Sequence, residues 1–589
     1  MKKTILLPVF ALFSILETKA QITENITIDI GSISSTDSII KPHMLGVIAG
    51  PAANYNNLVV PDLTSRYQDI GVTSVRNNDY FDDRLDMERM FFCGNYDSIP
   101  YAATPYPNWN CDPNDTANYH FVESDIQFQN WLDGGFLPFF RLGGENAHNI
   151  NQHDYKGPRA NEEANWLKAG LNVVNRYNNF EGGSNTLQGY LNLWTEYPQN
   201  QFWDRDSVEF NNFWCTNFDS LKTNFPTLKI GGPGFNSSVS IQIGNTINAN
   251  ISDHVDLFLR ELHGRSLKPD WIGFHVFSNT IDDFYNSAVR YRKLLRAEPP
   301  FTSYTSVWGN GNNSFFDGVE LICDAWGFDN DQSLPASTRD SLFNKQRGAA
   351  HHTGAFIALQ QADIERAYIY RGGEFGSDVT LGVMGLFQGD ANAAYKPVAY
   401  GFKQCSKMQT IYNKKLISPV SAIASNGGVI WTLAGEDVDG NKAVLLSNPT
   451  SNTINVSLTL NSTGLSTSMY PYVNQYTVTD ANDGQTPAPW TSGVFVLPPY
   501  TSNLITMTTT AVGINSPISN KPLISLYPNP SNNTVGFSEI LQDIEVYNLF
   551  GQLVLPKIKS AKSISVQALT NGIYFIHANN TILKFTVEH

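Results

Sequence analysis

Two carboxylates in this chain stand where short apolar runs end, and their types and positions would suit acid–base chemistry. Glu196 lies near the end of the run 191–198, in which Pro198 stops a strand from continuing. Asp324 lies near the end of the run 319–327. Hydrolysis of a glycosidic bond uses such a pair, because one carboxyl group protonates the leaving oxygen while the other attacks the anomeric carbon or activates water. A lone glutamate is more often an ordinary loop residue, so the prediction depends on a fold that brings the two together.

Other polar and aromatic residues stand near the ends of apolar runs and extend the same inventory. These candidates for substrate contacts are Arg76, Asn78, Trp194, Thr195, His275, Trp326 and Glu374. The sequence contains no serine nucleophile elbow, no histidine-rich metal cluster and no phosphate-binding loop. Carboxylates among aromatic and amide side chains favour chemistry on a sugar, and we predict neither a cofactor nor a metal.

Eight short apolar runs alternate with helical patterns and would position these residues. The runs cover 43–50, 71–77, 137–144, 191–198, 228–234, 271–278, 319–327 and 366–373, and clear helical periodicity covers 253–262, 281–295 and 341–362. Strands buried on both faces that alternate with helices imply a parallel sheet, and eight such units predict a closed (β/α)8 TIM barrel. An open doubly wound sheet would require a glycine-rich phosphate turn after its first strand, and residues 50–53 do not form one.

Five segments resemble glycoside hydrolase family 39, in the retaining-barrel clan that contains β-xylosidases and α-L-iduronidases. Residues 193–198 (Leu-Trp-Thr-Glu-Tyr-Pro) resemble the family's Trp-Asn-Glu-Pro segment, and residues 229–233 (Lys-Ile-Gly-Gly-Pro) resemble the Gly-Gly-Pro on the next strand. Residues 71–76, 274–277 and 396–400 resemble its Val-Arg strand, its Ser-x-His-x-Tyr strand and the segment that closes the barrel. The resemblance implies that Glu196 is the proton donor, that Asp324 occupies the nucleophile position, and that His275 lies near the sugar.

Three positions depart from the family pattern: Thr195 replaces an asparagine, Asp324 replaces a glutamate, and Asn77-Asn78 replaces a histidine. Retaining enzymes hold their carboxyl groups about 5 Å apart and inverting enzymes about 6.5–9.5 Å apart. The shorter aspartate therefore leaves three possibilities: a nucleophile with a compensating backbone shift, an inverting mechanism through water, or a site that has lost hydrolysis.

Several roles around this pair remain open at the level of sequence. Glu374 is an alternative second carboxylate, and Glu145 is a further one. Trp194, Trp308 and Trp326 are candidates for a platform on which a sugar ring stacks, although buried tryptophans are common in barrels. Thr195 would offer a hydroxyl to the 2-hydroxyl of the sugar.

The remainder of the chain divides by pattern into further units. We expect a signal peptide over 1–20, the barrel over 21–415, a β-sandwich over 416–510 and a linker over 511–521, with residues 21–40 belonging either to the barrel or to the sandwich. Residues 522–589 resemble the C-terminal sorting domain of type IX secretion cargo, which implies a Bacteroidetes-type source and export through both membranes to the surface or beyond.

Charge and cysteine content limit the partners. A net charge of −15 disfavours nucleic acid, and no run after the signal peptide is long enough for stable membrane insertion. Among five cysteines, Cys93 and Cys111 flank a polar loop and predict a disulfide, whereas Cys215 and Cys323 lie in apolar runs and predict buried thiols. The expected partners are a carbohydrate substrate and the type IX secretion machinery.

The sequence therefore predicts a secreted glycoside hydrolase that acts on oligo- or polysaccharides through two carboxylates. The main alternative is a glycan-binding surface protein that keeps the barrel cleft but does not hydrolyse its ligand. A structural or adhesive surface protein is a further alternative, favoured if the strand-end carboxylates do not converge.

Overall fold

The computed structural model describes most of the chain. The described residues are 23–35, 38–51, 62–77, 85–93, 110–144, 157–198, 202–236, 242–243, 246–247, 252–329, 333–373, 384–389, 392–419, 421–423, 429–491, 493–509, 526–527, 531–548, 552–578 and 581–589. The expected signal peptide and linker, together with Asn78, Glu145 and Glu374, lie outside these residues.

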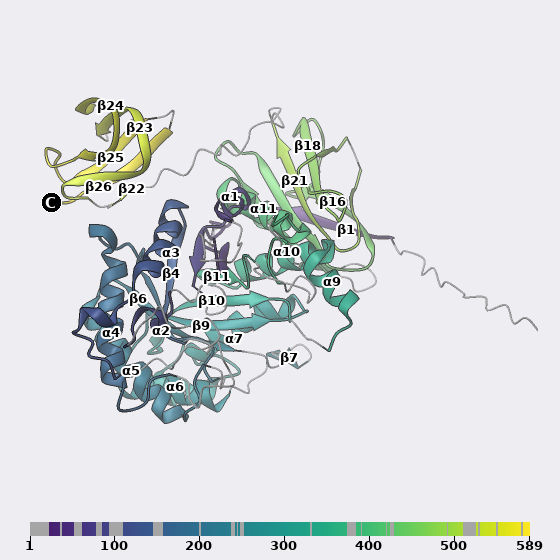
Figure 1. The fold of residues 1–589 in the computed structure, drawn as a ribbon. Coiled ribbons are helices and arrows are strands. Elements are labelled where there is room, and N and C mark those ends of the chain that lie inside the picture. The colour runs from purple at the N-terminus through teal and green to yellow at the C-terminus, as the bar shows by residue number, and fades with distance from the viewer. Residues whose placement is uncertain are drawn as a thin grey trace, which may run out of the picture.

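Eight parallel strands close into a barrel at the centre of the molecule (Figure 1). In barrel order they are β2 (Gly46–Ile48), β3 (Ser74–Arg76), β4 (Leu137–Leu142), β5 (Tyr190–Leu193), β6 (Lys229–Asn236), β9 (Trp271–Phe277), β10 (Glu320–Gly327) and β11 (Arg366–Ile369). Each strand falls within or overlaps one of the eight predicted apolar runs, so the predicted TIM barrel is confirmed. A short hairpin, β7 (Gln242–Ile243) with β8 (Thr246–Ile247), follows β6.

Helices surround the barrel. They are α1 (Thr64–Ile70), α2 (Met87–Met90), α3 (Val122–Asp133), α4 (Glu163–Asn178), α5 (Ser207–Asn224), α6 (Asp253–Gly264), α7 (Asp282–Leu295), α8 (Thr305–Trp308), α9 (Ala336–Asn344), α10 (Gln346–Gln361) and α11 (Pro397–Thr410). In α6, Ser252 caps the N-terminus through its side chain, and the apolar residues at three- and four-residue spacing are the buried ones.

The single helix predicted over 341–362 is in fact two helices, α9 and α10. Lys345 between them has extended backbone angles (φ −119°, ψ 173°), which interrupt the helical hydrogen bonds. The Gln346 backbone N–H that this break exposes donates to Asp480 Oδ1 at 2.7 Å. A residue 134 positions away thus accepts a hydrogen bond from the first residue of α10, a contact that local periodicity cannot show.

A two-layered β-sandwich follows the barrel. One sheet contains β12 (Lys414–Lys415), β13 (Ser421–Ile423), β14 (Val429–Glu436), β15 (Lys442–Asn448), β18 (Tyr472–Val478), β19 (Ala488–Pro489) and β21 (Thr501–Thr508); the other contains β1 (Thr23–Ile30), β16 (Thr453–Leu460), β17 (Thr463–Gly464) and β20 (Phe495–Leu497). β1 pairs with β16 in parallel, so the first described strand lies in the sandwich. An apolar core of both sheets, including Ile28, Val456 and Ile505, lies between them.

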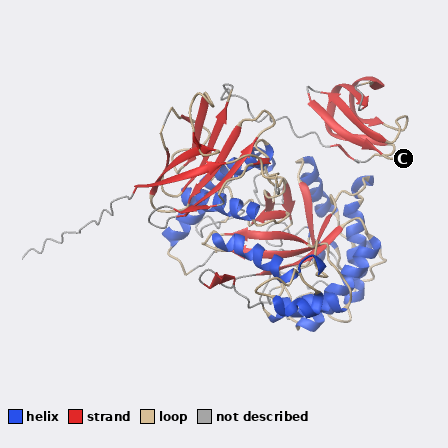
Figure 2. Ribbon diagram, turned by 180° about the vertical axis from the view of Figure 1, so that it is seen from behind, coloured by secondary structure: helices blue, strands red, loops and turns tan. Residues whose placement is uncertain are grey.

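The sandwich packs directly against α10 and α11 of the barrel, as both views show (Figures 1 and 2). Ser447 donates to the Ala350 carbonyl at 2.6 Å, and Ser502 lies 2.8 Å from the Thr353 hydroxyl. Leu445 and Leu504 belong to the same apolar cluster as the barrel helices. The sandwich thus supports the side of the barrel that contains β10 and β11.

The last residues form a separate small all-β unit, drawn in yellow in Figure 1. Its strands are β22 (Leu526–Tyr527), β23 (Thr534–Asn548), β24 (Leu553–Ser565), β25 (Gly572–Ala578) and β26 (Thr581–Val587). They pair in antiparallel fashion and enclose their own core, which includes Val535, Ile576 and Phe585.

The cysteine predictions hold in the structure. Cys93 and Cys111 form a disulfide with a Cα–Cα distance of 5.6 Å, and Cys215 and Cys323 are buried free thiols. Within the described ranges, no helix combines the length and apolar character that crossing a bilayer requires.

Candidate active site

Glu196 is presented by strained backbone just beyond the end of β5. Trp194 and Glu196 both adopt left-handed backbone angles, with φ of 70° and 49°. Such angles cost a non-glycine residue about 1–3 kcal/mol and tend to occur at functional sites. The Trp194 ring, which packs against Trp166 and Phe213, anchors this turn. The turn leaves the Glu196 side chain 17% exposed at the carboxyl end of the barrel.

Asp324 is placed by a β-bulge in β10. Cys323 pairs with Phe274 of β9, but the next pair joins Ala325 to His275, so Asp324 is one residue more than β9 provides. The pairing of β10 with β11 shifts across the same segment. A bulge re-aims the side chain of the extra residue. The Asp324 carboxylate consequently points into the barrel, where it is fully buried (0% exposed).

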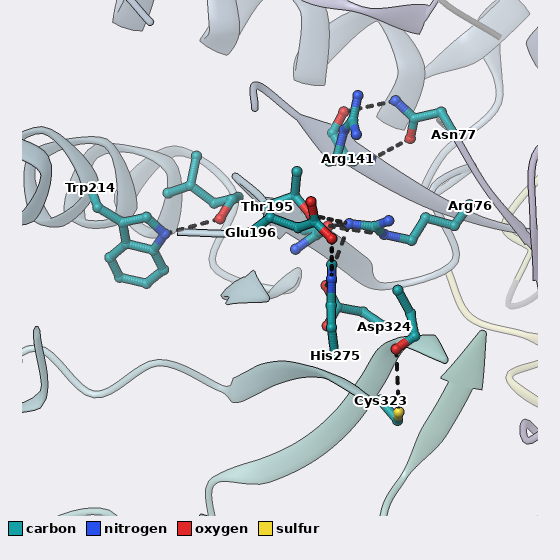
Figure 3. A network of polar contacts seen from close by, with 12 residues as sticks. Arg76, Asn77, Arg141, Thr195, Glu196, Trp214, His275, Cys323 and Asp324 are labelled. Carbon is teal, nitrogen blue, oxygen red and sulfur yellow. Dashed lines mark hydrogen bonds and ion pairs between the residues drawn. The ribbon is translucent and has the colours of Figure 1, made fainter. Parts of the chain in front are cut away.

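The His275 ring lies between the two carboxylates (Figure 3). Its Nδ1 is 2.9 Å from Glu196 Oε1, and its Nε2 is 3.4 Å from Asp324 Oδ2. Each ring nitrogen therefore faces a carboxylate oxygen, an arrangement that best suits an imidazolium, in which both nitrogens carry hydrogen.

The electrostatic surroundings agree with a charged ring. Burial by itself would lower the pKa of His275, but the carboxylates of Asp324 and Glu196 outweigh burial and raise this pKa to about 9. These surroundings therefore favour the positively charged form of the ring.

Arg76, at the end of β3, links this cluster to β5. Its guanidinium donates to Asn192 Oδ1 at 2.9 Å and to Thr195 Oγ1 at 2.9 Å, and it lies 3.4 Å from Asp324 Oδ2. The hydroxyl of Thr195 thus already has a partner inside the protein and is almost fully buried. Arg76 and His275 together place two cationic groups on one buried carboxylate oxygen.

Two glycines make room for Asp324. A Cβ on Gly234, which has a φ of 67°, would lie 2.7 Å from Asp324 Oδ2 and 2.8 Å from His275 Nε2. A Cβ on Gly273 would lie 2.8 Å from Asp324 Oδ1. Real Cβ atoms do not approach other atoms so closely, so both positions require glycine while Asp324 stays in place.

The structure brings Arg76, Thr195, Glu196, His275 and Asp324 together but places the two tryptophans elsewhere. Trp326 packs outside the barrel against Phe284 of α7 and His352 of α10, and Trp194 packs against α4 and α5. Both rings are buried, which corrects their assignment to a sugar platform. Trp194 points away from the barrel interior because it precedes the inward-facing Thr195, whereas Trp326 points outward because the bulge at Asp324 breaks the alternation of side chains along β10.

Three members of the cluster were missed at the level of sequence: Asn192, Gly234 and Gly273. A signal existed for Asn192, because it is an amide inside the otherwise apolar run 191–193. Asn77, the residue directly after β3, exchanges hydrogen bonds with the Arg141 backbone at 2.6 and 3.0 Å and so ties β3 to β4. Among the described residues, no group of three or more histidine, cysteine, aspartate or glutamate side chains is arranged to hold a metal ion.

The C-terminal unit matches a known family model. Residues 525–588 match the Secretion system C-terminal sorting domain. This domain marks the chain for type IX secretion to the cell surface or the exterior.

Comparison with solved structures identifies the fold of the barrel and sandwich as that of glycoside hydrolases. A glucosidase from Croceicoccus marinus is 16% identical, with a TM-score of 0.60, over 83% of this chain and 100% of that one. A monomeric β-xylosidase from Caulobacter crescentus is 13% identical, with a TM-score of 0.54, over 82% of this chain and 100% of that one. A family 39 glycoside hydrolase from the gut symbiont Bacteroides cellulosilyticus is 12% identical, with a TM-score of 0.50, over 80% of this chain and 82% of that one. No curated protein matches the chain in sequence.

Proposed function

We propose that this protein is a secreted glycoside hydrolase that cleaves O-glycosidic bonds in oligo- or polysaccharides. The observation that carries the proposal is the meeting of Glu196 and Asp324, from β5 and β10, on the two sides of one imidazole at the carboxyl end of the barrel. This end of a (β/α)8 barrel holds the active site in characterised enzymes of the fold.

Glu196 is the group that we assign to the glycosidic oxygen. Its carboxyl group is partly exposed, whereas Arg76, Thr195, His275 and Asp324 are nearly or fully buried. A carboxyl group at the mouth can hydrogen-bond the bound glycosidic oxygen and pass it a proton as the carbon–oxygen bond breaks. The names of the fold neighbours, which include a glucosidase and a β-xylosidase, support a glycoside substrate.

The second carboxylate is Asp324 or Glu374. Because one imidazole spans the gap, the nearest oxygens of Glu196 and Asp324 lie at most about 8.5 Å apart, a limit that is compatible with both inverting and retaining enzymes. The ring itself occupies that gap, so direct attack by Asp324 on a sugar would require His275 to move. Glu374 follows β11 in sequence and remains the alternative second carboxylate.

The complete burial of Asp324 favours one second candidate, a glycan-binding protein without hydrolytic activity. In that case the charged cluster stabilises the barrel mouth, and Glu196 contacts a bound sugar without transferring a proton. The two candidates differ in whether bond cleavage depends on Glu196.

Hydrolysis of a panel of aryl glycosides and polysaccharides tests the proposal. The full chain is assayed beside Glu196→Gln, Asp324→Asn and Glu374→Gln, and NMR of the first-formed anomer distinguishes retention from inversion. Cleavage that Glu196→Gln abolishes supports hydrolysis, and a loss in Asp324→Asn or Glu374→Gln as large as that in Glu196→Gln supports that residue as the second carboxylate. If the four proteins bind a glycan but none of them cleaves it, the chain is a glycan-binding protein and not a hydrolase.

A further inference from the structure

We infer that Asp324 acts as a positioning residue, which fixes the His275 ring so that its Nδ1 faces Glu196 and sets the proton affinity of that carboxyl group. The inference rests on the proposed function and gives each of three residues in that site a separate role. Glu196 meets the substrate, His275 adjusts Glu196, and Asp324 holds His275.

The burial of Asp324 excludes direct contact with a bound sugar in this arrangement. Its side chain is 0% exposed, and its oxygens lie against the backbones of Gly234 and Gly273. Oδ2 faces His275 Nε2 and the Arg76 guanidinium at 3.4 Å each. Within the described part of the chain, Oδ1 has no hydrogen-bond partner. The contacts of this carboxylate are therefore with cationic side chains of the protein.

Asp324 determines which ring nitrogen carries a hydrogen. His275 Nε2 lies 3.4 Å from Asp324 Oδ2, so a hydrogen on this nitrogen faces the Asp324 carboxylate. His275 Nδ1 and Glu196 Oε1 then share one further proton across 2.9 Å. With the proton on the ring, Glu196 is a carboxylate facing an imidazolium; with the proton on Glu196, the ring is neutral and accepts from it.

The charged groups around His275 decide where that proton lies. Asp324 on β10 and Glu196 beyond β5 both attract it, Arg76 on β3 offsets part of the Asp324 charge, and Tyr291 on α7 is buried nearby with a pKa that burial raises. Two carboxylates against one guanidinium leave a net attraction for a positive ring, in agreement with the raised pKa of His275.

The neighbours of Glu196 act on it with different strength. The imidazole is 2.9 Å from Glu196, whereas the Asp324 oxygen contacts the opposite ring nitrogen, and a Coulomb interaction falls with distance. Loss of the Asp324 charge therefore acts on Glu196 chiefly because His275 then loses its proton and its positive charge. Without an imidazolium beside it, Glu196 binds its proton more tightly.

The pH dependence of kcat/KM tests this directly. The limb of the profile that reports Glu196 should move to higher pH in Asp324→Asn, with kcat lowered about 10- to 100-fold, the loss known for carboxylates that orient a metal-bound histidine. A shift of that limb to lower pH would show that Asp324 acts on Glu196 through its own charge. Restoration of Asp324→Asn by added azide would show that Asp324 is itself the attacking group. Either result overturns the inference.

Asp86→Asn is the matched control. Asp86 also forms a buried ion pair in the barrel, with Arg141 at 2.8 Å, but His275 is not its partner in that pair. This variant should lower the free energy of unfolding while its pH profile stays in place. A profile that moves equally in both variants would assign the effect to general loosening of the barrel and would contradict the positioning role.

A titration of His275 followed by 15N NMR needs no substrate, and its wild-type arm needs no variant. In the wild-type chain both ring nitrogens should stay protonated until about pH 9, and in Asp324→Asn the ring should lose its proton at a lower pH. A wild-type ring that is neutral at pH 7 overturns the inference. If no glycoside is cleaved, the proposed function fails while this titration still decides the relation between Asp324 and His275.

Discussion

Gly234 on β6 and Asp324 on β10 touch across the end of β9, and a Cβ on the glycine would lie 2.7 Å from Asp324 Oδ2. The register of β6 against β9 also shifts between Gly232 and Phe235, beside the bulge that re-aims Asp324. Irregular strand pairing on both sides of β9 thus places the Gly234 backbone and the Asp324 carboxylate on the same side of the His275 ring.

Gly234→Ala should displace Asp324 or His275. The new methyl group meets both side chains, and the φ of 67° adds backbone strain of about 1 kcal/mol. We expect a fall in thermal stability and loss of most activity. Gly182→Ala is the control, because Gly182 has a φ of 78° and nothing within 4 Å of the added Cβ. Equal activity losses in the two variants would contradict a steric role for Gly234.

Arg76→Lys should be far from conservative. The planar guanidinium contacts Asn192, Thr195 and Asp324 at once, and a single ammonium group cannot reproduce that geometry. Leaving a buried carboxylate poorly paired costs about 3–5 kcal/mol, so the denaturation midpoint should fall markedly. Asp324→Asn in the same background should recover part of the loss, since the uncompensated charge is gone. Additive losses in urea titrations would argue against coupling of the two residues.

Much of the fold could be predicted because barrel strands are buried on both faces and therefore read as continuous apolar runs. The same logic located Glu196, His275 and Asp324, since polar residues at the ends of such runs stand out. The bulge at Asp324 and the left-handed angles at Trp194 and Glu196 could not be predicted, because they are local departures from the strand pattern that tertiary contacts hold in place. The direction of the Trp326 ring depends on that bulge, so its role was assigned incorrectly.

The free energy of unfolding should decrease as the pH rises from 7 to 10. A histidine whose pKa rises from 6.5 to about 9 on folding stabilises the native state fully below pH 6.5, and this stabilisation disappears as pH rises through 9. The contribution is about 3 kcal/mol at most. Urea unfolding at pH 7 and pH 10 should show the loss in the wild type and a smaller loss in His275→Gln. An identical loss in both proteins would assign it to other groups.

The pKa of His352 in α10 is shifted in the opposite direction, so His352 affects stability at acid pH. Burial lowers the pKa of His352 to about 4, so its neutral form stabilises the fold above pH 6.5 and this stabilisation is lost as pH falls toward 4. His352→Gln should therefore flatten part of the acid decline measured by urea unfolding between pH 7 and pH 4. Substitution of the exposed His577 should leave the decline as it is, and a flattening there would contradict the assignment.

A comparison of Glu196→Gln with Glu181→Gln tests whether the partly exposed carboxyl group of Glu196 performs glycoside cleavage. Both glutamates have a φ of 49°, but Glu181 is exposed beyond α4 on the outside of the barrel. On the best substrate of the glycoside panel, we expect Glu196→Gln to lower kcat about 10²- to 10⁴-fold with little change in thermal stability, while Glu181→Gln matches the wild type. Full activity of Glu196→Gln on a substrate that the wild type cleaves would contradict this role.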